Sequence, residues 1–303
     1  MRVTVVVPAY NEEEMIGRTI TELVKLKPEM AEKSIDFKVY VVDDGSRDAT
    51  ERLAREAGAD RVVRHRVNQG LGAAVRSGLT AAHGDGADIT IKFDADLQHD
   101  PQDIHQLIKP ITQDTADVVY GNRFERISYQ MPLVRRLGNK VFTGLMRWLT
   151  KWPLKDSQPG IFAVARVYTA QFYLPGDYNY TQQILTDAYR KGMRFEHVSV
   201  AFRERTTGRS FVSLRYPFKV LPQIFLVLVA VRPLKIFGPI GGLFFMLGLL
   251  LGIWEMGQWI FGVTEKPIVH VNAVMGFTLF GLQTLFFGIL AHLIVDANKI
   301  HRK

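Results

Sequence analysis

The chain has 303 residues, no cysteine and a formal net charge of +8 at neutral pH. The lack of cysteine excludes a disulfide framework, a thiolate metal site and a cysteine nucleophile. The positive charge favours anionic partners such as nucleic acid, acidic lipid headgroups or phosphorylated substrates.

The first two thirds of the chain alternate short β-branched runs with helical stretches. We expect no secretory signal, because residues 1–8 are too short for its apolar core and instead predict a buried strand. The runs that predict strands are residues 3–7, 38–42, 61–64, 90–93 and 118–120. The stretches that predict helices are residues 12–25, 49–57, 71–82 and 101–110. This alternation predicts an α/β fold with a mainly parallel sheet, in which ligands bind at the carboxyl ends of the strands.

The composition changes at about residue 213. Residues 213–235 form a basic and apolar region that is too short to cross a bilayer and predicts an interfacial helix. Two longer apolar stretches follow, at about 237–261 and 271–295, and each reaches the roughly 20 residues that a membrane span needs. The alternative is a pair of buried helices in a large soluble core. Glu255 is unusual in such a stretch, and we expect it near the end of the span, within reach of headgroups.

Lysine and arginine gather outside the two apolar stretches. Those that precede the first stretch are Arg203, Arg205, Arg209, Arg215, Lys219, Arg232 and Lys235. Those that follow the second are Lys299, Arg302 and Lys303, whereas the loop between the stretches holds one lysine, Lys266. The positive-inside rule therefore predicts a multi-pass protein of the cell membrane with both termini and the domain of residues 1–212 in the cytoplasm.

Polar residues follow the first two predicted strands. Tyr10 can stack on a base, while Asn11 and Glu12 are placed to cap the next helix, which is the favoured role for the cluster alone. After the second strand, the carboxylate of Asp44 can accept hydrogen bonds from a base or ribose. An Asx turn with helix capping by Ser46 or Asp48 is the alternative, and we expect both roles, from different residues.

The third cluster, Asp94-Ala95-Asp96-Leu97-Gln98-His99, follows another predicted strand. Mg²⁺ and Mn²⁺ prefer oxygen ligands and are often held by one or two carboxylates together with substrate phosphates. An isolated Asp-x-Asp is weak evidence for a metal site. Its place after a strand, with two similar clusters beside it, favours a metal site for Asp94 and Asp96.

Together the three clusters resemble the family 2 glycosyltransferases, which have the GT-A nucleotide-sugar-binding fold. The resemblance points to the branch that acts on polyprenyl and dolichyl phosphates, which includes dolichyl-phosphate mannose synthases. It extends through residues 68–78, 94–99, 121–123, 135–139, 156–160 and 205–210.

The resemblance implies a role for each motif. The implied ligands of Mg²⁺ or Mn²⁺ are Asp94, Asp96 and Gln98. The implied nucleotide-binding residues are Pro8, Ala9, Tyr10, Glu12, Asp44 and Asp94. The implied ligands of the acceptor phosphate are Arg123, Arg135, Arg136 and Asn139, for which a basic face against anionic lipid is the alternative.

The remaining implied roles concern the sugar and the reaction itself. The residues that would contact the sugar or diphosphate are Asp156, Gln158, Arg205 and Ser210. The residues implied to be catalytic are Asp96, Arg123 and Arg205. Two departures stand out: the branch usually has Gly-Phe-Arg where this chain has Gly160-Ile161-Phe162, and it usually has lysine where this chain has Phe211. Two expected cations are therefore missing around the sugar and phosphates.

The implied activity is transfer of a hexosyl group from a nucleotide sugar of the GDP-mannose or UDP-glucose type to a polyprenyl or dolichyl phosphate, with inversion and a divalent metal. Homo-oligomerisation stays open. A processive polysaccharide synthase is an alternative, but Gly144 stands where the Gln-x-x-Arg-Trp box before Arg147-Trp148 needs glutamine. A catalytically silent membrane scaffold is favoured by Phe162 and Phe211 and opposed by the intact Asp-x-Asp. A nucleic-acid binder is disfavoured because the basic residues gather beside the apolar stretches.

Overall fold

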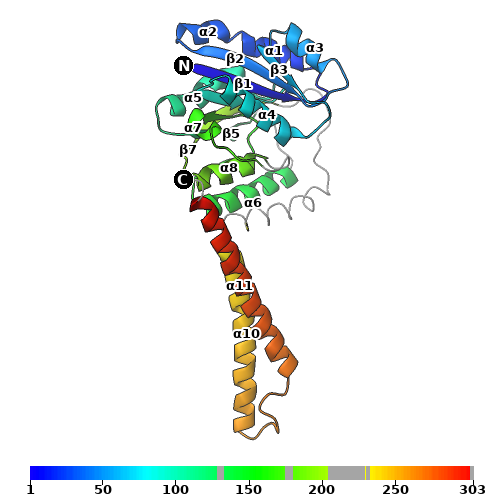
Figure 1. Cartoon of the computed structure of the whole chain (residues 1–303), viewed down its shortest axis with the longest axis vertical. Helices are drawn as coiled ribbons and strands as arrows, with labels where there is room; N and C mark the ends of the chain where they lie inside the picture. The colour runs from blue at the N-terminus through cyan, green and yellow to red at the C-terminus, as the bar shows by residue number, and fades with distance from the viewer. Residues whose placement is uncertain (128–132, 175–179, 204–228, 230–232, 301–303) are drawn as a thin grey trace. The chain divides into compact units, whose positions relative to one another are not determined.

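The computed structural model describes residues 1–127, 133–174, 180–203, 229 and 233–300, and the side chains of residues 127–137, 149, 296 and 298–300 lie outside this description. The chain divides into two compact units, Met1–Phe211 and Val212–Lys303. Figure 1 shows the first unit as the sheet with its helices and the second as the pair α10 and α11.

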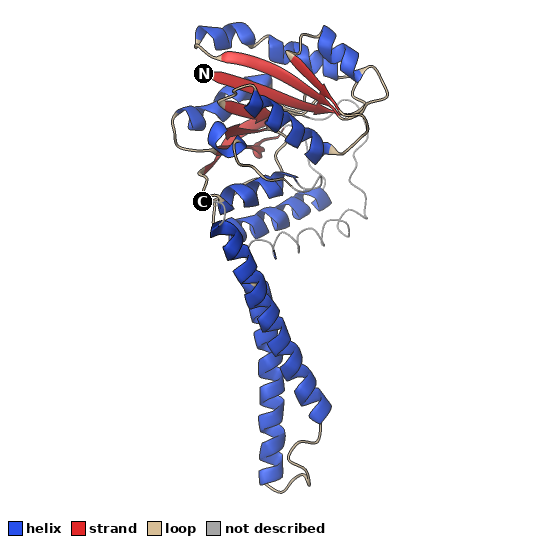
Figure 2. Ribbon diagram, in the orientation of Figure 1, coloured by secondary structure: helices blue, strands red, loops and turns tan. Residues whose placement is uncertain are grey.

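The strands of the first unit form one sheet, drawn in red in Figure 2. Among the described residues they are β1 (Arg2–Ala9), β2 (Asp36–Asp43), β3 (Arg61–Arg64), β4 (Ile89–Lys92), β5 (Val118–Ile127), β6 (Phe162–Ala165) and β7 (Phe195–Phe202). Their order is β3-β2-β1-β4-β6-β5-β7. Strand β6 runs antiparallel to β4 and β5, while the other pairs are parallel. The prediction of an α/β fold with a mainly parallel sheet is confirmed.

Helices cover both faces of this sheet. They are α1 (Ile16–Val24), α2 (Lys27–Glu32), α3 (Thr50–Glu56), α4 (Leu71–Gly84), the 3₁₀ turn η1 (Pro101–Asp103), α5 (Ile104–Thr112), α6 (Leu133–Thr150), α7 (Arg166–Thr169) and α8 (Tyr180–Arg190). Alternate residues of β1 point to opposite faces, so Val5 packs in the core that contains α1 and α5, whereas Val6 packs in the core beneath α4. In α1, Ile16, Ile20 and Leu23 recur at helical spacing and supply its buried face.

Several predicted boundaries shift in the structure: β5, for example, extends to Ile127 rather than to residue 120. The helix predicted from residue 12 begins at Ile16, because the backbone of Asn11 and Glu12 bonds to the loop after β2 instead. Within the first unit, the elements after β5 (α6, β6, α7, α8 and β7) carried no prediction. This part of the chain supplies β6, which inserts between β4 and β5 and completes the sheet.

The second unit contains α10 (Leu234–Ile260) and α11 (Val271–Ile300), which match the two predicted spans. Both are long and apolar enough to cross a membrane, and only 11% and 17% of their apolar windows are buried. The helices pack through small residues: a Cβ on Gly281 would lie 2.3 Å from the Phe245 nitrogen, and one on Gly248 would lie 2.7 Å from the Thr278 nitrogen. Close backbone approach of this kind is typical of helix pairs in membranes. Nearly all of the predicted interfacial region, residues 213–235, lies outside the described residues.

Glu255 has a different environment from the one we expected. Its side chain is buried rather than directed to headgroups. The carboxylate accepts hydrogen bonds from the backbone nitrogens of Val269 and His270, at 2.8 and 3.1 Å, and lies 2.7 Å from Nδ1 of His270. It thus satisfies backbone donors just before α11, where a helix start lacks internal partners.

Candidate active site

The predicted polar clusters meet at one edge of the sheet. Strands β1, β2, β4 and β5 run in the same direction, so their carboxyl ends lie at the same edge. Pro8 and Ala9 end β1 beside Val42 and Asp43 of β2, and the Asp-x-Asp follows β4. Tyr10, the next residue after β1, is 42% exposed and so presents a ring on which a base can stack.

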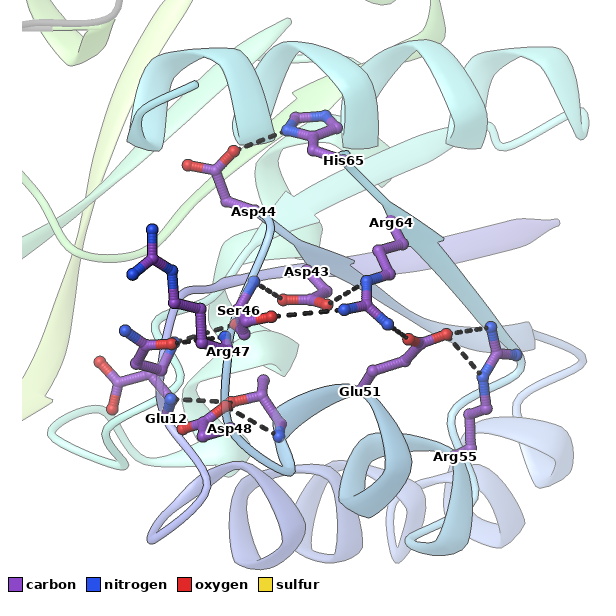
Figure 3. A network of polar contacts seen from close by, with 12 residues as sticks. Glu12, Asp43, Asp44, Ser46, Arg47, Asp48, Glu51, Arg55, Arg64 and His65 are labelled. Atoms are coloured by element: carbon purple, nitrogen blue, oxygen red, sulfur yellow. Dashed lines mark hydrogen bonds and ion pairs between the residues drawn. The ribbon is translucent and has the colours of Figure 1, made fainter. Parts of the chain in front are cut away.

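The loops after β1 and β2 bind each other, as Figure 3 shows in part. The Asn11 nitrogen donates to Oγ of Ser46 at 3.0 Å, and the Arg47 nitrogen donates to Oδ1 of Asn11 at 2.9 Å. The Glu12 nitrogen donates to Oγ1 of Thr50 at 2.9 Å. The side chain of Asn11 therefore bonds to the loop after β2 rather than to α1, which corrects the expectation that it caps the next helix. Asn11 has a positive φ of 52° and turns the chain toward the second loop.

The two aspartates after β2 have separate tasks. Oδ1 of Asp43 accepts the Ser46 nitrogen at 3.0 Å and closes a turn from Asp43 to Ser46, and Oδ2 lies 3.4 Å from Nε of Arg64. Figure 3 shows Arg64 extending from Asp43 to Glu51. This turn fixes the direction of the chain just before Asp48, whose Oδ1 accepts the backbone nitrogen of Thr50 at 3.0 Å.

Asp44 is buried, and its carboxylate organises the loop that leads into α4. It accepts hydrogen bonds from the nitrogens of Gln69 and Gly70, at 2.9 and 2.8 Å, and from Nδ1 of His65 at 2.7 Å. Gly70 has a φ of 95°, which side chains rarely tolerate, and immediately precedes α4. Nucleotide binding by Asp44 stays a prediction. The contacts that the structure shows for Asp44 fix the loop that ends at Gly70.

Lys92, the last residue of β4, is a site residue that the sequence analysis missed. It is 1% exposed, its ammonium pairs with Oδ1 of Asp94, and it donates to the Gly160 carbonyl at 2.8 Å. Burial is the largest single influence on the pKa of Lys92 and would lower it, but the Asp94 carboxylate and Tyr180 together outweigh burial and raise that pKa above its ordinary value. The available signal was a lysine at the end of a short buried strand, two residues before Asp94.

The rest of the acidic loop turns sharply. Oδ1 of Asp96 accepts the Gln98 nitrogen at 3.1 Å, and Leu97 has a positive φ of 54°. Nε2 of Gln98 donates to the Arg203 carbonyl at 3.1 Å, and the Arg203 nitrogen donates to the Gln98 carbonyl at 2.8 Å. Gln98 therefore joins this loop to the end of β7.

The surroundings of Asp94 fit a divalent ion. A Cβ on Gly160 would lie 2.3 Å from Oδ2 of Asp94 and 2.4 Å from Nε2 of His99, so the glycine keeps space open beside both atoms. His99 is fully buried, its Nε2 has no hydrogen-bond partner in the described part of the chain, and burial lowers its pKa to about 4. The described residues contain no group of three or more acidic, histidine or cysteine ligands. An ion here would therefore take ligands from a bound diphosphate as well.

Arg123, Asp156 and Asn139 form a buried group on the other side of the acidic loop. Nε and Nη2 of Arg123 contact the Asp156 carboxylate at 2.7 and 3.2 Å, and Nδ2 of Asn139 lies 3.4 Å from it. The Gln158 nitrogen donates to the same carboxylate at 2.9 Å. Burial is the largest single influence on the pKa of Asp156 and would raise it, but the Arg123 guanidinium together with the hydrogen bonds from Gln158 and Asn139 outweighs burial and lowers that pKa. Two predicted acceptor ligands and two predicted sugar ligands are thus brought together.

A cavity of about 520 Å³ opens next to this group. It is lined by residues of β5, α6 and the segment before β6, namely Asn122, Phe124, Glu125, Asn139, Lys140, Thr143, Gly144, Arg147 and Lys155. Lys155 pairs with Glu125 at 2.8 Å, and Arg147 donates to the Leu154 carbonyl. The lining of the cavity is mainly polar, with three cationic side chains, and Phe124 is its one large apolar residue.

Four predicted site residues cannot be placed in this geometry. Arg135 and Arg136 belong to the first turn of α6, but their side chains lie outside the description. Arg205 and Ser210 lie outside the described residues, as does Phe211. Their roles stay predictions.

Comparison with known proteins identifies the family. The family model described as glycosyl transferase family 2 matches residues 4–170. Relatives with a named activity include the UDP-N-acetylglucosamine–dolichyl-phosphate N-acetylglucosaminyltransferase of Methanococcus voltae, which is 32% identical over 53% of this chain and 68% of its own length. The undecaprenyl-phosphate 4-deoxy-4-formamido-L-arabinose transferase of Pectobacterium atrosepticum is 28% identical over 94% of this chain and 84% of its own.

A solved structure supports the fold. The glucosyl-3-phosphoglycerate synthase of Mycobacterium tuberculosis, in complex with Mn²⁺, UDP and glucosyl-3-phosphoglycerate, superposes with a TM-score of 0.58 at 23% identity, covering 75% of this chain and 78% of that one. This likeness confirms the GT-A-like fold. The relatives confirm the resemblance to the polyprenyl- and dolichyl-phosphate branch, and the chain is a glycosyltransferase that belongs to glycosyl transferase family 2.

Proposed function

We propose that this protein transfers a hexosyl group from a nucleotide sugar, of the GDP-mannose or UDP-glucose type, to a polyprenyl or dolichyl phosphate at the cytoplasmic face of a membrane. One observation carries the proposal. In the sheet, β4 with its Asp94 and Asp96 lies between β1 and β2, which carry Tyr10 and Asp44, and β5, which carries Arg123. A donor bound at the β1 and β2 loops and an acceptor bound near Arg123 would therefore meet at Asp94 and Asp96.

The donor half of the site is preorganised by the chain itself. The β1 and β2 loops are joined through Asn11, and Asp44 holds the loop that ends at Gly70. Tyr10 is the exposed ring for the base. Asp94 and Asp96 would hold Mg²⁺ or Mn²⁺, which when bound would offset the negative charge that develops on the departing diphosphate.

The acceptor half needs positioning more than proton transfer. A phosphomonoester with a second pKa near 6 is largely dianionic at neutral pH, so no strong general base is required. The buried Arg123, held rigid by Asp156, would orient that phosphate for direct attack on the anomeric carbon. Direct displacement inverts the anomeric configuration. Arg135 and Arg136 are proposed to complete the phosphate site.

Two observations favour a lipid rather than a soluble acceptor. The helices α10 and α11 expose apolar side chains along most of their length. The transferases of Methanococcus voltae and Pectobacterium atrosepticum are named for dolichyl- and undecaprenyl-phosphate acceptors. With the basic residues that flank the two helices, this supports a catalytic domain and termini on the cytoplasmic side.

The experiment supplies the full chain, in detergent, with Mn²⁺, a polyprenyl phosphate and a panel of nucleotide sugars. We expect sugar transfer to the lipid, abolished by Asp96→Asn. Arg136→Ala should spare donor binding and lose transfer to lipid phosphate. Transfer that is unchanged in both variants would refute the site assignment.

The product separates the alternatives. A single sugar on the lipid supports this proposal, whereas a growing polymer indicates a processive synthase. No turnover of any nucleotide sugar by folded protein would favour a silent scaffold. The anomeric configuration of the product, read by NMR, tests inversion.

A further inference from the structure

Lys92 brings a positive charge into the centre of the acidic loop. Its side chain is buried to 1% exposure, and its ammonium contacts Oδ1 of Asp94 and the Gly160 carbonyl. The nitrogen also lies 5.7 Å from the centroid of the Tyr180 ring. A buried ammonium with a carboxylate, a carbonyl and an aromatic face around it is held in a fixed place.

The strand pairing gives this lysine a specific neighbour. In the antiparallel ladder of β4 and β6, Lys92 is the partner of Phe162. Phe162 is the buried position at which the sequence departs from Gly-Phe-Arg. Strand β6 thus lacks the expected cation at Phe162, but Lys92 supplies one from the paired position of β4. The ammonium of Lys92 lies at the Asp94 carboxylate.

The charges determine what this arrangement does to a metal ion. Asp94 and Asp96 would attract a divalent ion with two negative charges, but Lys92 compensates one of them. The ammonium pairs with Oδ1 of Asp94, so an ion that binds at Oδ2 would share the charge of this carboxylate with Lys92. A nucleoside diphosphate adds negative charge to the same place and would restore the attraction.

We propose that Lys92 is a positioning residue, an internal cation that orients Asp94 and makes divalent-metal binding depend on the donor diphosphate. The inference rests on the proposed function, because it takes Asp94 as a metal ligand. It predicts that the ion and the nucleotide bind together rather than one by one. An enzyme of this kind does not hold its ion tightly between turnovers.

The test measures Mn²⁺ binding by electron paramagnetic resonance on the full chain in detergent. GDP and UDP are added in parallel, since either can be the donor nucleotide. For the wild type we expect weak binding of Mn²⁺ alone and roughly tenfold tighter binding with the correct nucleotide. In Lys92→Met, Mn²⁺ alone should bind roughly tenfold tighter than to the wild type, and the nucleotide should add little.

Three further variants separate charge from structure. Lys92→Arg keeps the cation and should keep the wild-type dependence on nucleotide. Lys92→Met with Phe162→Lys moves the cation to the opposite strand and should restore part of that dependence. Lys109→Met is the matched control, because this lysine is exposed on α5, and it should behave as the wild type.

The outcomes distinguish the inference from the function on which it rests. Equal Mn²⁺ affinity in the wild type and in Lys92→Met overturns the inference and leaves the proposed metal site intact. Mn²⁺ binding that is absent in every protein, with and without nucleotide, overturns both. If Lys92→Met does not fold, the test rests on the wild type alone. A wild-type affinity for Mn²⁺ that is the same with and without nucleotide also overturns the inference.

Discussion

The carboxylate of Asp156 lies 2.7 Å from Nε of Arg123, and their side chains are 0% and 9% exposed. The pair joins the segment before β6 to β5, so it fixes two loops of the active-site edge against each other. A guanidinium held in this way presents its charge to a substrate without a loss of side-chain entropy on binding.

Replacing Asp156 by asparagine should destabilise the protein by about 3 kcal/mol, because it leaves the Arg123 charge buried without a counter-charge. Asp114→Asn is the matched control: Asp114 pairs with Arg194 at 2.5 Å but is 88% exposed. Exposed pairs contribute about 1 kcal/mol or less. Thermal unfolding in detergent measures the stability of both variants. An equal loss of stability in the two would show that the buried pair contributes no more than the exposed one.

Stability should fall as the pH drops from about 6.5 to 4, and His197 is one cause. Burial lowers the pKa of His197 to about 4 in the folded protein. Its Nδ1 lies 3.3 Å from the Tyr120 carbonyl, and its Nε2 accepts the Lys155 nitrogen at 2.9 Å. The unfolded chain takes up a proton near pH 6.5, so over this range protonation favours unfolding, by up to about 3 kcal/mol for this group.

The variant His197→Gln removes the titrating group and should make this decline shallower. The measurement is the midpoint of thermal unfolding at several pH values between 4 and 7. A slope identical to that of the wild type would show that His197 does not contribute.

Gly160→Ala should reduce transfer roughly 100-fold, the size of effect that a displacement of about 1 Å in an active site can have. The added methyl would collide with Oδ2 of Asp94 and Nε2 of His99. Gly84→Ala is the control, because a Cβ there meets nothing within 4 Å. Steady-state transfer rates compare the two, and full activity of Gly160→Ala would contradict the proposed metal position.

Gly281→Ile should separate α10 from α11 and lower the unfolding midpoint in detergent, at a cost of about 1–3 kcal/mol. The new side chain would meet the backbone of Phe245 and Gly241. Gly276→Ile places the same residue on α11 where nothing lies within 4 Å. Equal midpoints for the two variants would argue against the glycine contact.

The sequence by itself determined the fold class, the family and the two apolar helices. These follow from local patterns: β-branched runs that alternate with helical stretches, three polar clusters after strands, and two long apolar stretches that hold a single charged residue, Glu255. Such patterns need no knowledge of which residues meet in space. The sequence also predicts a metal site at Asp94 and Asp96, because both residues lie in one short motif directly after a strand.

Only the tertiary structure decided what each polar side chain contacts. Asn11 looked like a helix cap and instead bonds to Ser46 and Arg47, far along the chain. Lys92 was given no role from the sequence, and only the insertion of β6 beside β4 places Phe162 opposite it and the Gly160 carbonyl at its ammonium. A buried charge takes its partner from wherever the fold brings one, and that choice is not written in local spacing.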